Sequence, residues 1–152
     1  MIQRIQTVYL LLAGIFPAFT FFTPVAFFAK GFAWANLNSM GYETANVPEL
    51  AGSHPWALLA FSLLSIIIAF VALGGYRNRK RQLRWITFAL LSNFCWYLSL
   101  GFYAFTVSEA ISLPLSFTVS SLIPLVAMVL LWMARKAIRY DEQLVKAADR
   151  IR

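Results

Sequence analysis

The sequence predicts an all-α integral membrane protein, built as a four-transmembrane-helix bundle with both termini in the cytoplasm. Of its 152 residues, 61% are hydrophobic and 12% are charged, and the mean hydropathy is +0.70. The charged share is about half that of a typical soluble domain. The apolar residues form four blocks of membrane-spanning length. The lysines and arginines are also divided unevenly between the segments that separate these blocks.

The first two spans are expected at residues 7–29 and 56–75. The first apolar run is longer than the core of a signal peptide, which has about 7–15 residues, so we expect it to stay in the mature chain. Pro17 and Pro24 lie inside it and are expected to kink the helix.

The longest segment between spans, residues 31–55, is expected to form a structured outer loop. It mixes turn-favouring residues such as Asn36 and Pro48 with apolar ones such as Trp34. A flexible linker would lack the apolar residues. The segment is therefore expected to pack on the outer membrane surface, with a short hairpin around Leu37–Val47.

The third and fourth spans are expected at residues 86–107 and 114–133. Asn93 is the most notable polar residue of the third. Because an amide in hydrocarbon needs a partner, a hydrogen bond to another helix is favoured over a ligand contact. Pro124 is expected to kink the fourth span near its middle.

Small residues recur at helical spacing and predict where helices approach closely in a left-handed bundle. The predicted helix-packing residues are Gly14, Ala18, Ser62, Ser65, Ala69, Ala72, Asn93, Ser116, Ser120 and Ala127.

The basic loop at residues 76–85 sets the predicted orientation. Twelve of the 13 lysines and arginines lie on its side of the predicted membrane, and only Lys30 lies on the other. The positive-inside rule therefore places this loop and both termini in the cytoplasm. The lysines and arginines on this side are expected to attract anionic lipids rather than nucleic acid. The predicted lipid-headgroup contacts are Arg77, Arg79, Lys80, Arg81, Arg84, Arg135, Lys136 and Arg139.

Residues 135–152 are predicted to form a cytoplasmic amphipathic helical tail that continues the last span, so that residues 1–152 make a single membrane domain. Tyr140, Leu144 and Ile151 lie on its apolar side. They are the predicted docking residues for a membrane-protein partner or a second copy of the chain. A solvated helical extension is the alternative.

The sequence contains no recognisable catalytic constellation. The predicted spans hold no acidic or basic residue, which counts against proton-coupled transport. His54 is the only histidine, and the nearby glutamates lack the spacing of metal ligands. Cys95 is the only cysteine and is expected to pack as a small apolar residue. We therefore expect no enzyme activity, no cofactor and no metal.

Both ends of the chain resemble a known family. The stretches from Met1 to Ala13 and from Ala134 to Arg152 are similar to the uncharacterised bacterial family called domain of unknown function 4293, and the likeness covers essentially the whole chain. The resemblance implies a small multi-pass protein of the bacterial inner (cytoplasmic) membrane. It implies no particular activity.

Two functions are left open. The favoured one is a non-catalytic accessory or scaffold subunit of a bacterial inner-membrane protein assembly, because small-residue faces, a structured loop and an amphipathic tail all suit protein contacts. The alternative is binding or transport of a lipid or a small apolar molecule, in a groove between the first and fourth spans that their prolines hold open. An enzyme has the least support.

Overall fold

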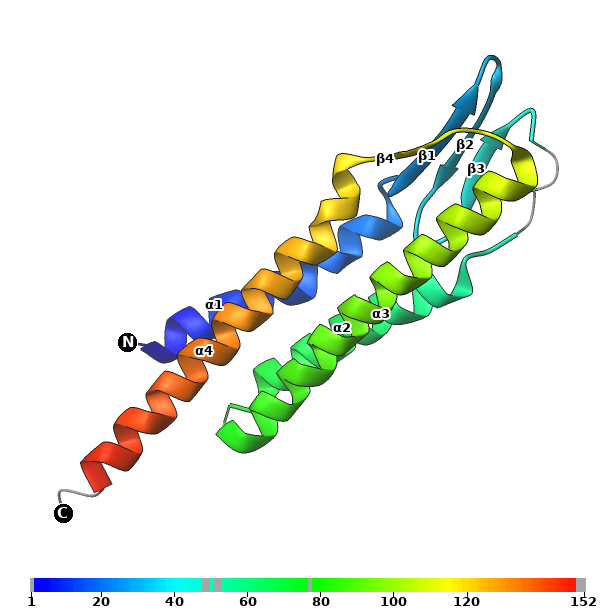
Figure 1. Cartoon of the computed structure of the whole chain (residues 1–152). Helices are drawn as coiled ribbons and strands as arrows, with labels where there is room; N and C mark the ends of the chain where they lie inside the picture. Colours follow the sequence, from blue (N-terminus) through cyan, green and yellow to red (C-terminus); the bar gives the residue numbers. More distant parts are fainter. Residues whose placement is uncertain (1, 48–49, 51–52, 77, 150–152) are drawn as a thin grey trace.

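The structure is a computed structural model that describes residues 2–47, 50, 53–76 and 78–149, and the side chains of all of these except 2–4 and 145–149. Four helices run along one axis, and a small sheet lies at one end of them (Figure 1). We call this the sheet end. The opposite end, where the first helix begins and the last one ends, is called the terminal end.

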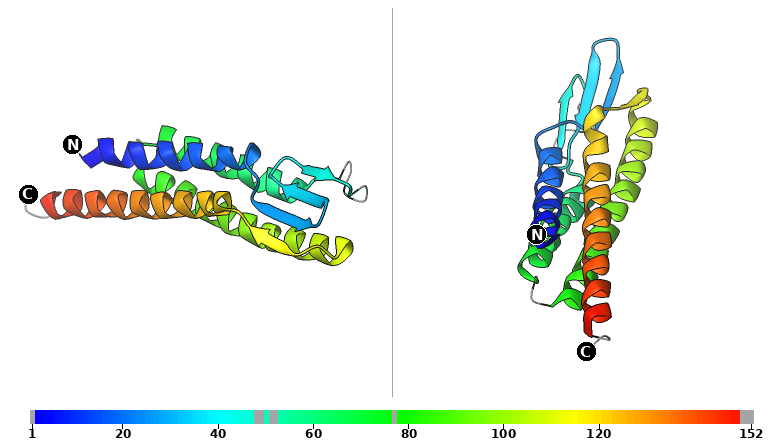
Figure 2. Two further views of the ribbon diagram at one scale, coloured as in Figure 1. Left: turned by 90° about the horizontal axis from the view of Figure 1, so that it is seen from above. Right: turned by 90° about the vertical axis from the view of Figure 1, so that its left-hand side faces the viewer.

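The helices are α1 (Ile2–Ile15), α2 (Trp56–Gly74), α3 (Arg79–Ile111) and α4 (Ile123–Asp149). α1 packs against α2 and α4, and α3 packs against the same two helices, so the four form a closed ring (Figure 2). Within the described residues, α2, α3 and the stretch Val119–Leu144 are long and apolar enough to cross a membrane. The apolar helix Ile5–Phe21 is shorter.

The prediction of a single helix over residues 7–29 is wrong. α1 ends at Ile15 and is followed by a 3₁₀ helix, η1 (Phe16–Phe21), and then by a strand that starts at Ala26. Pro17 stands at the start of η1. Since proline has no N–H to continue the α-helical ladder, the helix changes to the tighter form there. A short apolar run fits a buried strand as well as a helix. The apolar composition therefore predicted a helix that continued too far along the chain.

The all-α prediction is also incomplete, because the chain contains an antiparallel sheet. Its strands are β1 (Ala26–Lys30), β2 (Ala33–Leu37), β3 (Tyr42–Ala45) and β4 (Leu115–Phe117), in the order β3-β2-β1-β4. Gly31 has φ +64° in the two-residue turn between β1 and β2, a conformation that costs glycine little. The hairpin expected around Leu37–Val47 is present as β2–β3, in which Leu37 pairs with Tyr42.

The last helix begins later than predicted. Residues 115–117 form β4, the next turn is a second 3₁₀ helix, η3 (Val119–Leu122), and α4 starts only at Ile123. β4 pairs with β1, which satisfies backbone groups that a helix would have satisfied internally. Pro124 therefore lies in the first turn of α4, where its missing N–H is not needed. The predicted mid-span kink at Pro124 is wrong.

Two apolar clusters hold the molecule together. At the sheet end, Phe28 and Leu37 from the inner face of the sheet pack with Trp96 and Leu100 of α3. Nearer the terminal end, a second cluster joins all four helices and includes Leu10, Ile86, Leu131 and Ile138. Strand residues between the buried ones, such as Phe27, are exposed. The sheet thus covers one face of the long helix α3 and leaves its other face open.

Candidate functional site

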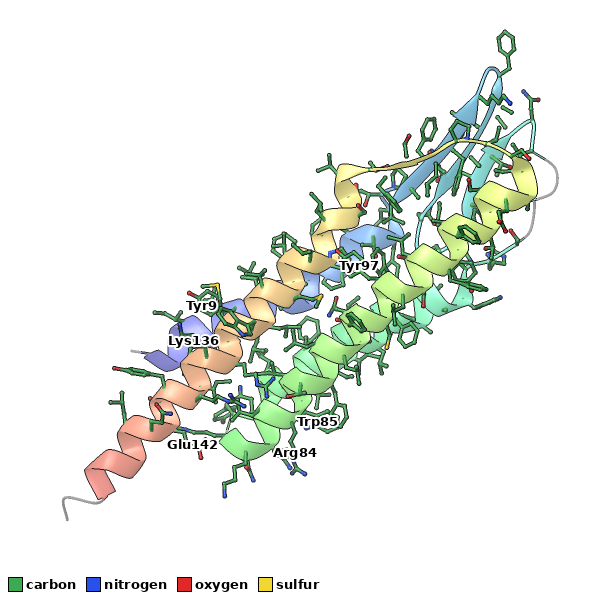
Figure 3. All side chains as sticks on the ribbon, in the orientation of Figure 1. Tyr9, Arg84, Trp85, Tyr97, Lys136 and Glu142 are labelled. Carbon is green, nitrogen blue, oxygen red and sulfur yellow. The ribbon has the colours of Figure 1, made fainter. Side chains whose placement is uncertain are left out.

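A groove of about 1070 Å³ lies between α1 and α4 towards the terminal end. Ile5 and Tyr9 of α1 form one side of it. Figure 3 labels Tyr9 and Lys136, which come from the two helices and lie near each other along this groove. The residues contributed by α4 are Val129, Trp132, Met133, Arg135, Lys136, Ala137, Arg139, Tyr140 and Gln143.

The lining of the groove changes in character along its length. Val129 and Met133 make its part nearer the sheet end apolar, whereas Arg135, Lys136 and Arg139 make the part nearer the terminal end cationic. At 1.5 Å per residue, the stretch of α4 from Val129 to Gln143 is about 21 Å long. The groove can therefore contact an elongated molecule with one apolar and one anionic end.

The cations of the groove are held in different ways. Lys136 Nζ lies 5.7 Å from the ring centroid of Trp132, a cation–π contact that keeps the ammonium beside the groove. Arg135 Nε is buried, with no hydrogen-bond partner in the described part of the chain. Leaving a buried donor unpaired costs about 1–3 kcal/mol, and more when the group is charged. Arg135 thus has an unmet donor in a side chain that lines the groove.

The remaining predicted headgroup residues lie outside the groove. Arg79 Nη2 donates to Asp141 Oδ2 at 2.8 Å, an ion pair that ties the first turn of α3 to α4. The side chains of Lys80, Arg81 and Arg84 are exposed on α3. Arg77 lies outside the described residues. The structure therefore gathers only Arg135, Lys136 and Arg139 around one hollow.

Most of the predicted helix-packing residues lie inside the molecule. Gly14 and Ala69 come close between α1 and α2, where a Cβ added to Gly14 would lie 3.5 Å from Ala69 Cβ. Ala18 and Ser120 are half-buried in the 3₁₀ helices. Ser116 is different, because it lies in β4 with its side chain exposed and does not belong to a helix interface. The buried members are Gly14, Ser62, Ser65, Ala69, Ala72, Asn93 and Ala127.

Asn93 has partners on two helices. Its Nδ2 donates to Ser65 Oγ of α2 at 2.6 Å and to the Ala89 carbonyl oxygen of α3 at 2.9 Å. One residue earlier, Ser92 Oγ donates to the Phe61 carbonyl oxygen at 3.0 Å. Polar groups of α3 thus line the seam with α2.

A second buried polar cluster was not predicted from the sequence. Ser39 Oγ donates to Thr20 Oγ1 at 2.9 Å, and Thr20 Oγ1 lies 3.4 Å from Ser62 Oγ. Trp96 Nε1 donates to Ser39 Oγ at 3.4 Å. The cluster joins η1, the β2–β3 hairpin, α2 and α3. The signal that could have revealed it is Thr20 itself, a hydroxyl within an otherwise apolar run that needs a partner when buried.

The tail residues fall into two groups. α4 is continuous through residue 149, and Ile138 is buried in the bundle. Tyr140 and Leu144 are exposed, and Tyr140 also lines the groove. Ile151 lies outside the described residues. Tyr140 and Leu144 are therefore the part of the predicted docking surface that the structure places on the outside.

Within the described chain, no group of three or more His, Cys, Asp and Glu side chains could hold a metal ion. The His54 ring lies beside Trp56, with 5.6 Å between ring centroids, and its Nδ1 is 3.3 Å from the Met40 carbonyl oxygen. Cys95 is a free, half-buried thiol in α3.

No curated protein matches the chain. A family model with the description "Domain of unknown function (DUF4293)" matches residues 2–151, which is nearly the whole sequence. The chain therefore belongs to the DUF4293 family.

Proposed function

We propose that the chain crosses the bacterial inner membrane four times, with both termini in the cytoplasm. Three crossings are the long apolar helices described above. The remaining one, the first in the chain, is α1 together with η1. The apolar stretch Ile5–Phe21 has eleven α-helical and six 3₁₀ residues, which give about 28 Å at 1.5 and 2.0 Å per residue. This is close to the roughly 30 Å of the hydrocarbon core. The terminal end carries the cationic loop, so the positive-inside rule favours the cytoplasm for it.

Within this membrane, the protein acts as a non-catalytic accessory or scaffold subunit of a larger assembly. The observation that supports this most is that its buried polar side chains form hydrogen bonds between structural elements. Asn93 bonds to Ser65, and Thr20 bonds to Ser39, so these groups join structural elements to one another. An active site instead leaves reactive groups convergent and accessible in a pocket.

The outer face of the sheet offers a surface for a partner. Phe27 and Trp34 lie on this face and are exposed, and Phe32 at the neighbouring turn is 93% exposed. Aromatic side chains that gather on an exposed surface are typical of protein interfaces. The partner is a membrane protein or a second copy of the chain. Tyr140 and Leu144 offer a further contact at the terminal end.

The proposal is tested by isolating the protein from its native membrane in mild detergent after brief crosslinking. The parent is expected to elute with a stoichiometric partner, or as an oligomer. The variant Phe27→Ala/Trp34→Ala is expected to lose that association. A control, Leu91→Ala/Phe94→Ala, truncates two residues that are similarly exposed on α3 and is expected to keep it. If the unsubstituted protein elutes as a monomer and is crosslinked to no other chain, the accessory role is refuted.

A further inference from the structure

We propose that the groove between α1 and α4 is a specific binding site for one anionic glycerophospholipid of the surrounding bilayer. This inference rests on the membrane placement proposed above and is independent of the accessory role. The phosphate end of the lipid lies at Arg135 and Arg139, and an acyl chain runs along Val129 and Met133 towards the sheet end.

The length of the groove agrees with one leaflet. Its α4 wall, from Val129 to Gln143, is about 21 Å long. A bilayer with its headgroups is about 40–45 Å thick, so one leaflet is about 20–22 Å. The order of chemistry also agrees, because the apolar part lies deeper in the bundle and the cationic part lies at the terminal end. A lipid oriented like its neighbours in the bilayer therefore meets cationic groups at its phosphate and apolar groups along the first part of an acyl chain.

The charge of the groove selects the headgroup. Three of the described lining residues are cationic and none is acidic. Asp141 is close in sequence, but it is engaged by Arg79 at 2.8 Å and does not line the groove. Glu142 does not line it either. A zwitterionic headgroup would bring its own cation next to these three, whereas an anionic headgroup brings no such repulsion.

Arg135 provides the specific contact. Its Nε is a buried donor without a hydrogen-bond partner among the described residues, and the side chain lines the groove. A guanidinium binds phosphate oxygens through its fork of N–H groups. Nε is itself buried, so a phosphate in the groove reaches that donor only when the Arg135 side chain shifts. An unpaired donor on a lining residue still separates this groove from a basic surface that attracts anionic lipids in general.

The test is native mass spectrometry of the full-length protein in mild detergent, titrated with phosphatidylglycerol or with phosphatidylcholine of the same acyl chains. We expect one saturable phosphatidylglycerol adduct and at least tenfold weaker retention of phosphatidylcholine. Arg135→Gln/Arg139→Gln is expected to weaken the phosphatidylglycerol adduct at least tenfold. The control Lys80→Gln/Arg84→Gln removes the same charge at the same end of the molecule but outside the groove, and is expected to have less than a twofold effect.

A second variant tests the apolar part without changing charge. Met133→Trp fills the groove beside Val129 and is expected to weaken the adduct at least fivefold, and it carries the test if the arginine variant does not fold. Inorganic phosphate at millimolar concentration is expected not to displace the lipid, and displacement would mean a free-phosphate site. Equal loss in the groove and control pairs, or equal retention of both lipids, would overturn the proposal.

The membrane placement is measured separately by carbonate extraction of native membranes. Release of the chain into the soluble fraction would refute that placement, and with it the site. A chain that stays in the membrane pellet but binds both lipids equally refutes the site alone.

Discussion

The hydrogen bond between Asn93 and Ser65 gives a quantitative test of how α2 and α3 are joined. Both residues are 1% exposed, and Asn93 Nδ2 lies 2.6 Å from Ser65 Oγ. Hydrogen bonds between membrane helices contribute about 0.6 kcal/mol on average and at most about 1.7 kcal/mol. Because this one is short and fully buried, we expect a coupling free energy of about 1–1.7 kcal/mol.

The coupling is measured by a double-mutant cycle of Asn93→Ala and Ser65→Ala, from unfolding in mixed micelles with increasing denaturing detergent. The cycle is needed because Nδ2 also donates to the Ala89 carbonyl oxygen at 2.9 Å, which lowers the cost of Ser65→Ala alone.

The control cycle combines Ser65→Ala with Thr87→Ala. Thr87 Oγ1 donates to the Leu83 carbonyl oxygen of its own helix at 2.9 Å and is exposed. We expect no coupling there beyond about 0.3–0.5 kcal/mol, the usual error of additivity. If the Asn93–Ser65 coupling is no larger than that of the control, the reasoning is refuted.

Three further predictions concern packing, charge and pH. Ala69→Phe places a ring at a fully buried position and should lower the free energy of unfolding in detergent by about 1–3 kcal/mol. Ile67→Phe, at a side chain that is 58% exposed, should change it by less than about 0.5 kcal/mol, and equal losses would contradict the packing. A cycle of Arg79→Ala and Asp141→Ala should give a coupling of about 0.2–1 kcal/mol that shrinks as salt is added. A coupling free energy that does not change with salt concentration would contradict the ion pair. Burial, and secondly the phenol of Tyr103, raise the pKa of Tyr42 to about 12. The free phenol has a pKa of about 10, so this group's contribution to stability is complete below pH 10 and is lost as the pH rises to about 12. Tyr42→Phe should remove this part of the stability loss at alkaline pH. Phenolate absorbance measures the ionisation of Tyr42, and ionisation near pH 10 would contradict its burial.

The helix α2 is the part of the fold that could best be predicted from the sequence. Residues 56–75 were expected and Trp56–Gly74 is observed. Pro55 before it and the glycine pair at its end mark both boundaries locally. Asn93 was likewise predictable as a residue with an interhelical partner, because its amide has few alternatives in an apolar segment.

The sheet could not be predicted as a whole because the pairing of β1 with β4 is non-local. Ala26 pairs with Phe117, so β1 and β4 are joined across most of the chain. No local sequence signal near β1 or β4 indicates that they pair. Pro114, considered by itself, favours the start of a helix. The β1–β2 and β2–β3 hairpins have turns formed by adjacent residues and were within reach of local reasoning, but only the second was predicted.

The groove lies between the expected helices, but at another position along them than the prolines indicated. A groove between the first and last spans was expected from prolines that hold a bundle open. Pro17 and Pro124 both lie towards the sheet end, at the start of η1 and in the first turn of α4. The groove lies at the opposite end, beside Ile5 and Tyr9. There α4 continues past the start of α1, so part of its side is uncovered (Figure 1).

The two ends of the bundle are therefore joined by different chemistry, and this difference separates the two proposals. At the sheet end, the neutral hydroxyls of Thr20 and Ser39 bond to each other in a closed, buried cluster that leaves them no capacity for a ligand. An exposed face of the sheet can then act only through its aromatic surface, which suits a protein partner. At the terminal end, Arg135 lines an open groove and has a donor without a partner among the described residues. A group that is charged, half-buried and incompletely paired gains more from a phosphate than a solvated lysine does, because less water must be displaced from it. The two proposals therefore assign lipid recognition to the terminal end and protein recognition chiefly to the sheet.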